Sequence, residues 1–206
     1  MTAESPPWLS CPLPLSPPAS FTWSRIRSEF QYRRQKHIAA LAKKLIRDSM
    51  TLFLDSSSTV TYLAGELTAF HNLSIITNSV EIVYHLASHS NANVYASSGK
   101  VRNNITMYGA AAQAMVRERY SDAFFFSCSG ISAAHGTTES NEDSAEIKQI
   151  MYQNSNKRIL LCDSLKFDTV FSYKCFSLNQ LDALITDKKP SEEFMRSLPD
   201  SVTLYY

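Results

Sequence analysis

Short apolar segments alternate with segments of helical periodicity along most of this chain. Six runs rich in Val, Ile, Leu and Phe are expected to be strands, and a seventh, at 201–206, is expected to be an edge strand. The six runs occupy 51–55, 73–77, 93–98, 122–128, 158–163 and 183–187. Helical patterns separate them at 59–69, 79–88, 107–120, 144–155 and 191–198.

Strands joined by helices of about ten residues are usually parallel, because each helix supplies the crossover from one strand to the next. The order of segments therefore predicts an α/β fold. We expect a three-layer, Rossmann-like, mainly parallel sheet with helices on both faces.

The start of the chain has a different composition. Residues 1–24 hold six of the eight prolines and show no apolar periodicity, so we expect 1–29 to be a disordered linker or tail. The folded domain is expected to span 30–206. Its first helix carries an apolar stripe through Ile38, Ala42 and Ile46, and its basic residues are expected to face water. Nucleic-acid binding by this helix is therefore disfavoured.

Charge and cysteine usage narrow the class of protein. The net charge of +1 does not suit a polyelectrolyte-binding surface, and no run of about 18 apolar residues suggests a membrane helix. The four cysteines form no CxxC pair, so they are interpreted as structural thiols of a protein from the reducing cytoplasm. We expect no metal, no cofactor and no membrane partner.

Hydroxyl, amide, glycine and lysine residues follow the predicted strands at their C-terminal ends. The clearest case is Asp55 to Thr59, where an apolar run changes to Asp-Ser-Ser-Ser-Thr. In a parallel sheet these ends meet at one edge, where helix N-termini favour anions. A site rich in donors and with few charges suits a small, phosphorylated, hydroxylated ligand such as a sugar phosphate. The alternative is that these residues only cap helices.

Other functions remain open at this stage. A phosphosugar isomerase or deaminase would need a carboxylate or His as general base. His135 and Glu139 are expected in an exposed loop, and we expect no catalytic residue. The triple Phe at 124–126 could serve an oligomerisation module, but a core strand is the simpler interpretation.

Several short motifs together carry a family resemblance. They occur in order and at suitable separations, as Asp55–Thr59, Thr77–Ser79, Ser98-Gly99, Tyr108-Gly109, Gly130-Ile131, Gly136 followed by Glu146–Lys148, Asp163–Phe167 and Leu184–Asp187. The pattern resembles the effector-sensing domain of DeoR-type bacterial transcriptional repressors, over about residues 30–198. The resemblance implies a fold shared with ribose-phosphate isomerase and glucosamine-phosphate deaminase.

The resemblance also implies an effector, a partner and a set of binding residues. The effector would be a phosphorylated sugar, the sensor would be a homo-oligomer, and DNA would be bound only through a winged helix-turn-helix domain, which we expect to be absent from this chain. Gly99 and Gly130 would allow close backbone approach, and Lys166 would meet the phosphate. The implied ligand-binding set is Asp55, Ser56, Ser57, Ser58, Thr59, Thr77, Asn78, Ser79, Gly99, Lys100, Gly130, Ile131, Lys148, Asp163 and Lys166.

The chain departs from the family pattern at glycines. The family commonly has Asp-Ser-Gly-Thr-Thr where this chain has Ser57, and Gly-Gly where it has Ser98-Gly99. A glycine can take left-handed backbone geometry that other residues avoid. These replacements are expected to weaken binding or to change the ligand.

Overall fold

The computed structural model describes residues 29–103 and 105–206, so the predicted tail at 1–29 lies almost entirely outside the described residues. Residue contacts divide the chain into Met1–Tyr32 and Arg33–Tyr206. Helix α1, Glu29–Lys43, begins in the first unit and continues into the second. Everything described below belongs to the second unit.

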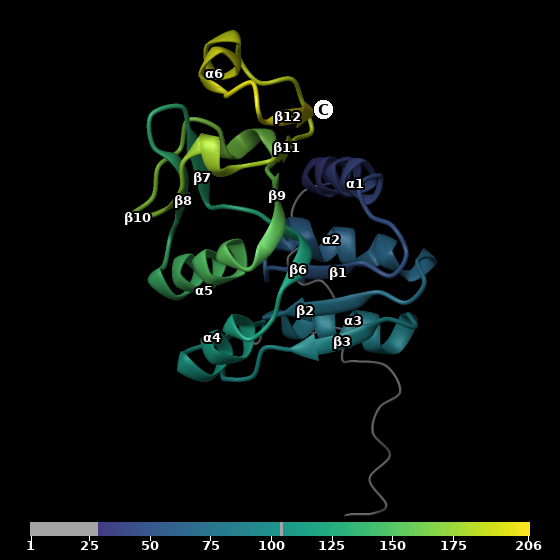
Figure 1. The fold of residues 1–206 in the computed structure, drawn as a ribbon. Helices are drawn as coiled ribbons and strands as arrows, with labels where there is room; N and C mark the ends of the chain where they lie inside the picture. The colour runs from purple at the N-terminus through teal and green to yellow at the C-terminus, as the bar shows by residue number, and fades with distance from the viewer. Residues whose placement is uncertain (1–28, 104) are drawn as a thin grey trace, which may run out of the picture. The chain divides into compact units, whose positions relative to one another are not determined.

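A parallel sheet of seven strands forms the centre of this unit, in the order β12-β11-β9-β6-β1-β2-β3 (Figure 1). All its neighbouring strands run parallel, and β12 is an edge strand, so the predicted strands and their parallel arrangement are confirmed. The strands are β1 Thr51–Leu54, β2 Ser74–Thr77, β3 Asn93–Ala96, β6 Ser121–Phe126, β9 Ser155–Leu161, β11 Ala183–Ile185 and β12 Thr203–Tyr205.

Helices cover both faces of this sheet, and alternating strand residues supply two separate cores. Leu52 and Leu54 pack under one set of helices, while Phe53 between them packs under the other. The first set is α1, α2 Ser58–Glu66 and α3 Val80–His89; the second is α4 Ala110–Arg117, α5 Glu142–Gln153 and α6 Glu192–Ser197. Figure 1 shows α4 and α5 on the opposite side of the strands from α1, α2 and α3. The predicted three-layer α/β fold is therefore confirmed.

The apolar segments are buried in the core, as their composition predicts. Phe124, Phe125 and Phe126 are fully buried in β6, which confirms the core-strand interpretation. Cys128 and Cys162 are buried free thiols, as predicted. Within the described residues no helix combines the length and the apolar character that a bilayer crossing requires.

Two small antiparallel sheets were not predicted. Strands β4 Lys100–Arg102 and β5 Thr106–Tyr108 form a hairpin where the sequence suggests a loop and the start of a helix. Helix α4 consequently begins at Ala110, after Gly109 at φ +95°, and the predicted start at 107 is wrong. The second sheet has the order β10-β8-β7, with β7 Gly130–Ser132, β8 Gly136–Glu139 and β10 Tyr173–Phe176. Single 3₁₀ turns lie at η2 Leu67–Ala69, η3 Ser164–Lys166 and η4 Leu178–Gln180.

Candidate functional site

The order of strands places a topological switch point between β1 and β6. The chain builds β1, β2 and β3 outward in one direction and then returns to the other side of β1 with β6. Ligands of open parallel sheets bind beyond the strand carboxyl ends at such a point, because the connecting loops diverge there. The residues at this position are Asp55, directly after β1, and Ser127, directly after β6.

The Asp55 carboxylate organises this point and is saturated with protein donors. Its Oδ1 accepts from the Ser57 amide at 2.9 Å and the Ser57 hydroxyl at 2.5 Å. Its Oδ2 accepts from the Ser127 amide at 3.0 Å and lies 3.0 Å from Lys148 Nζ. A carboxylate offers about four lone-pair positions, and all of them are used here. Asp55 therefore joins the β1 and β6 loops and has no acceptor left for a ligand.

Lys148 reaches the same point from α5 and is buried. Its ammonium donates to the Ser127 carbonyl at 2.6 Å and to Glu139 Oε1. Burial by itself would lower the pKa of Lys148, but the adjacent Glu139 and Asp55 carboxylates outweigh it and raise the pKa above its usual value. Lys148 is therefore a buried, ion-paired cation and not a solvated residue on the surface of its helix.

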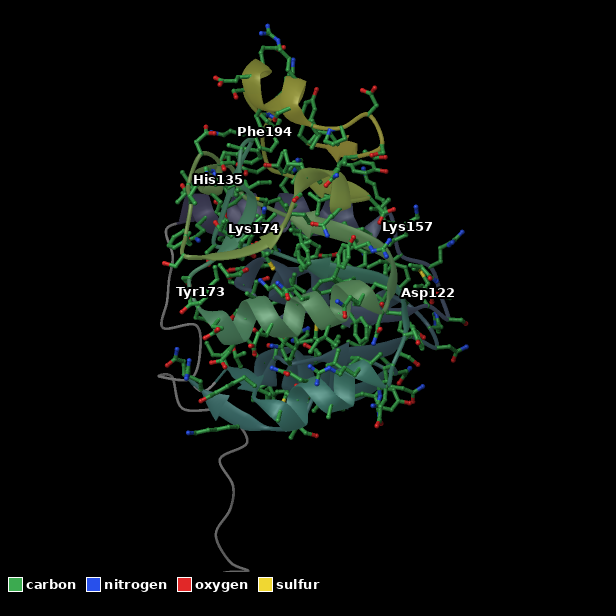
Figure 2. All side chains as sticks on the ribbon, turned by 60° about the vertical axis from the view of Figure 1, so that its left-hand side comes forward. Asp122, His135, Lys157, Tyr173, Lys174 and Phe194 are labelled. Atoms are coloured by element: carbon green, nitrogen blue, oxygen red, sulfur yellow. The ribbon has the colours of Figure 1, made fainter. Side chains whose placement is uncertain are left out.

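The prediction for Glu139 is wrong. It was expected in an exposed loop, yet it lies at the end of β8 with 5% of its surface exposed. Its Oε2 accepts from the Ser129 hydroxyl at 2.9 Å. His135, in the same predicted loop, is exposed as expected. Figure 2 labels His135 together with Tyr173 and Lys174 of the three-stranded sheet, where Tyr173 pairs with Glu139 at the other end of β8.

Lys166 is the more accessible cation at the switch point. It lies in η3 after β9, and 22% of its side chain is exposed, compared with 7% for Lys148. Its ammonium donates to the Ser127 hydroxyl at 2.9 Å and lies 3.7 Å from Asp163 Oδ2. Asp163 is buried, and its Oδ1 caps η3 by accepting from the Leu165 amide.

The serine run builds the N-terminus of α2. Ser57 is the N-cap residue, and its hydroxyl accepts from the Val60 amide. Ser56 accepts from the Thr106 hydroxyl at 3.1 Å, and Ser58 accepts from Gln35. Thr59 is fully buried, and its hydroxyl has no hydrogen-bond partner among residues 29–103 and 105–206. The capping interpretation thus accounts for Ser57, while the positive end of the α2 dipole still favours an anion.

The loop after β2 carries the next predicted residues. Thr77, Asn78 and Ser79 are all buried. Thr77 accepts from the Ser79 amide, and Ser79 caps α3. The backbone of Asn78 pairs with Met107 of the β4–β5 hairpin, and its side-chain Oδ1 has no protein partner.

The remaining predicted residues lie around the edge of this region. Gly99, at φ +97°, and Lys100 are exposed where the hairpin begins. Gly130 is buried at the start of β7, where a Cβ atom would lie 2.3 Å from the Thr169 carbonyl oxygen. Ile131 has its side chain in the core, so only its backbone could face a ligand.

The sequence did not indicate Ser127 or Thr106 as site residues, and it placed Glu139 in an exposed loop. Ser127 was assigned to the predicted strand at 122–128, but β6 ends at Phe126 in the structure. Glu139 closes the polar strand Gly-Thr-Thr-Glu, which carries no apolar alternation to reveal it. Within 29–103 and 105–206, no group of three or more His, Cys, Asp or Glu side chains could hold a metal ion.

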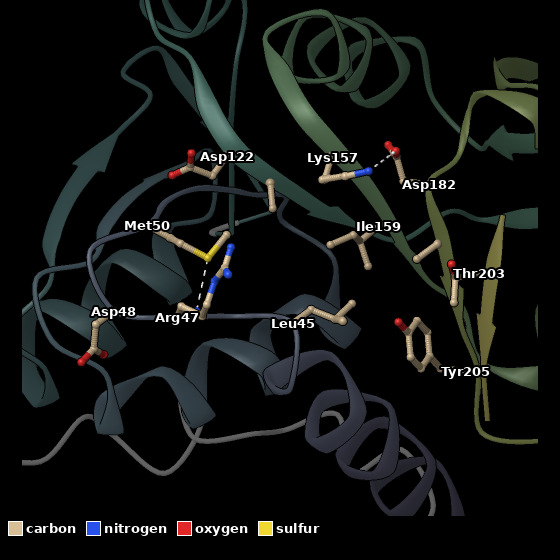
Figure 3. Close-up of a pocket in the computed structure, with 12 residues that line it drawn as sticks. Leu45, Arg47, Asp48, Met50, Asp122, Lys157, Ile159, Asp182, Thr203 and Tyr205 are labelled. Atoms are coloured by element: carbon tan, nitrogen blue, oxygen red, sulfur yellow. Dashed lines mark hydrogen bonds and ion pairs between the residues drawn. The ribbon is translucent and has the colours of Figure 1, made fainter. Parts of the chain in front are cut away.

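A hollow of about 660 Å³ lies at the other end of the strands, among the N-terminal ends of β6, β11 and β12. Figure 3 shows the residues that line it, among them Ile159, Tyr205 and the ion pair of Lys157 with Asp182. In Figure 2, Asp122 and Lys157, which line this hollow, lie on the right, and His135 and Tyr173 lie on the left. None of the fifteen predicted ligand residues lines this hollow.

Comparisons with known proteins give one family. A model of the DeoR C terminal sensor domain matches residues 31–188. The HTH-type transcriptional regulator GolR of Listeria innocua is 28% identical over 165 residues, which are 80% of this chain and 65% of the relative. The HTH-type transcriptional repressor GlcR of Bacillus subtilis is 31% identical over 158 residues, 76% of this chain and 60% of the relative. The L-fucose operon activator of Escherichia coli is 27% identical over 80% of this chain and 68% of its own length.

Some solved structures are similar to this chain at low sequence identity. The delta subunit of eIF2B from Chaetomium thermophilum has a TM-score of 0.54 at 15% identity, covering 79% of this chain and 58% of that chain. Ribose 5-phosphate isomerase A of Methanocaldococcus jannaschii has a TM-score of 0.48 at 16% identity, covering 65% and 53%. The eIF2B similarity concerns the fold alone.

Proposed function

Because the chain belongs to the family of DeoR C-terminal sensor domains, we propose that it binds a sugar phosphate as the effector of a bacterial transcriptional regulator. Its matched relatives are named as regulators, one of them a repressor and another an activator. The chain spans 60–68% of these relatives' lengths, so the function of a whole regulator is part of the proposal. Effector binding serves repression and activation alike, since it only has to favour one conformation.

The convergence of polar loops at the switch point is the observation that carries this proposal. Ser127, Lys166 and the first turn of α2 lie at the carboxyl ends of neighbouring strands. A partly exposed ammonium and a helix N-terminus both suit a phosphate group. The buried Thr59 hydroxyl and Asn78 Oδ1 have no hydrogen-bond partner in the part of the chain that the structure describes, and they would suit the hydroxyl groups of a sugar.

Catalysis is not part of the proposal. An isomerase or deaminase needs a carboxylate that can accept a proton from the substrate. The acceptor positions of Asp55 are filled by Ser57, Ser127 and Lys148, and Glu139 is held by Lys148 and Ser129. We therefore propose that a bound sugar phosphate is released unchanged.

The central experiment is thermal and chemical unfolding in the presence of a panel of sugar phosphates. An effector at one hundred times its dissociation constant should raise the free energy of unfolding by about 2.7 kcal/mol. The matched variant Lys166→Met should bind about tenfold more weakly or worse, and so reduce the increase to about 1.4 kcal/mol or less at the same concentration, because it removes the partly exposed ammonium. If no sugar phosphate stabilises the wild-type protein, the proposed effector class is wrong. NMR spectra of the same mixtures should show no turnover.

The remaining proposals concern partners and compartment. We propose that residues 30–206 form a homo-oligomer in the cytoplasm. We also propose that they bind no DNA by themselves, because α1 packs its apolar stripe into the core and its basic residues belong to the opposite, solvated face of the helix. Light scattering should give a mass above 23.2 kDa. A mobility-shift assay at moderate salt should show no retarded DNA, and retention of DNA would contradict the second statement.

A further inference from the structure

Ser127 connects the two lysines of the candidate site. Its amide donates to Asp55 and its carbonyl accepts from Lys148 at 2.6 Å, so its backbone is fixed from both sides. Its hydroxyl accepts from Lys166 at 2.9 Å. The orientation of Lys166 therefore depends on a residue that Lys148 holds in place.

The donors of Lys148 are all in use. An ammonium has three N–H donors, and the acceptors of Lys148 are the Ser127 carbonyl, Asp55 Oδ2 and Glu139 Oε1. Within the described residues, the ammonium of Lys166 has one hydrogen bond, to Ser127, because its 3.7 Å separation from Asp163 is too long for a second. Two N–H donors of the Lys166 ammonium are thus available to an anion. The Lys148 ammonium has no donor available.

We infer that Lys148 is a positioning residue that does not contact the effector, and that it holds Ser127 so that Lys166 alone of these two lysines meets the phosphate. The inference rests on the proposed function. Formal charge supports this division of roles: Asp55 and Glu139 outnumber Lys148, so the buried cluster has a formal charge of −1 and would repel an anion placed against it.

The test observes the two ammonium groups directly in the full chain labelled with ¹⁵N-lysine. In the free protein, Lys148 should give a slowly exchanging ammonium signal, because it is buried and fully hydrogen-bonded; the Glu139→Gln variant should shift this signal and so assign it. During titration with inorganic phosphate, the Lys166 signal should move while the Lys148 signal stays. A Lys148 signal that moves as far as that of Lys166 would overturn the inference.

Two variants separate position from charge. Lys166→Met should weaken phosphate binding about tenfold or more without moving the Lys148 signal. The double variant Lys148→Met/Glu139→Gln keeps the formal charge of the cluster at −1. It should also weaken phosphate binding, and it should shift the Lys166 signal because Ser127 is released. Wild-type affinity in this double variant would overturn the inference.

Failure of the proposed function would look different. If neither phosphate nor any sugar phosphate binds the wild-type protein, the effector proposal fails, but the free protein still decides the positioning role. A shifted Lys166 signal in the double variant supports the link through Ser127. An unchanged Lys166 signal, or a fast-exchanging Lys148 ammonium in the wild-type protein, overturns it.

Discussion

At the scale of single residues, the glycines show where the backbone of the site packs without room for a side chain. A Cβ atom on Gly130 would lie 2.3 Å from the Thr169 carbonyl oxygen. Gly130→Ala should therefore lower the free energy of unfolding by about 1–3 kcal/mol. The matched control is Gly65→Ala inside α2, where the nearest atom is 3.9 Å away and the change should add about 0.5–1 kcal/mol. Urea unfolding of both variants checks the opposite signs.

The two glycine replacements in the family pattern have different consequences. Ser57 has φ −75° and ψ 149°, which suits any residue, and it gains the capping bond. The expected loss of turn geometry therefore does not arise there. Ser98 has φ +63°, in the left-handed region that glycine prefers.

Ser98→Gly should consequently raise the free energy of unfolding by about 0.5–1 kcal/mol, because the relief of left-handed strain exceeds the added freedom of the unfolded chain. Ser57→Gly should lower it by about 1 kcal/mol, since it removes a cap and a donor to Asp55. Chemical denaturation measures both changes. If both substitutions changed the free energy of unfolding in the same direction, backbone geometry would not control these positions.

At the scale of secondary-structure elements, the sequence predicts what apolar burial determines and misses what tertiary contacts determine. The strands of the main sheet were found because alternate or consecutive residues are apolar. The hairpin β4–β5 and the strand β8 were missed, since Lys-Val-Arg and Gly-Thr-Thr-Glu have no such pattern. Their positions depend on partners distant in sequence. The sequence likewise indicated the polar loops that follow the strands, but not the contacts that Ser127, Glu139 and Thr106 make there.

The β4–β5 hairpin provides a prediction at this scale. Arg102 lies 3.0 Å from Asp143 and so joins the hairpin to α5, but their side chains are 53% and 35% exposed. Such a pair contributes about 0.2–1 kcal/mol. Arg102→Ala should therefore increase amide hydrogen exchange in the hairpin a few-fold and leave β1 and β6 unchanged, as measured by mass spectrometry. Lys189→Ala, which breaks an exposed pair with Glu192, is the control and should not affect the hairpin.

At the scale of the whole molecule, the buried ion pairs of Lys148 with Asp55 and Glu139 link the seven-stranded sheet to α5 and to the three-stranded sheet. Lys148 on α5 joins the loops after β1 and β6 to the end of β8. Lys148→Met would leave two carboxylates buried without their cation, and it should lower the free energy of unfolding by about 3–5 kcal/mol. Lys148→Met/Glu139→Gln should recover part of this loss, because only one unpaired carboxylate remains. Guanidinium unfolding compares the two, and equal stability would contradict the electrostatic cause.

The pH dependence of folding also has a cause that can be assigned. His85 is half-buried on α3, its Nε2 has no protein partner, and its ring stacks on His89 with centroids 5.1 Å apart. Burial, and then the neighbouring His89, lower the pKa of His85 below its ordinary value of 6.5. The folded protein therefore prefers the neutral ring, while the unfolded chain takes up a proton near pH 6.5. This contribution to stability is present above pH 6.5 and is lost as the pH falls through the lowered pKa.

His85→Gln should remove this part of the pH dependence. Between pH 7 and pH 5, the urea midpoint of the wild-type protein should fall more steeply than that of the variant. Both proteins retain Glu81, whose pKa burial raises, so its opposite contribution cancels in the comparison. Parallel midpoint curves would show that the His85 ring remains solvated in the folded protein. A steeper wild-type curve would assign acid sensitivity to α3, on the face of the sheet away from the Lys148 helix.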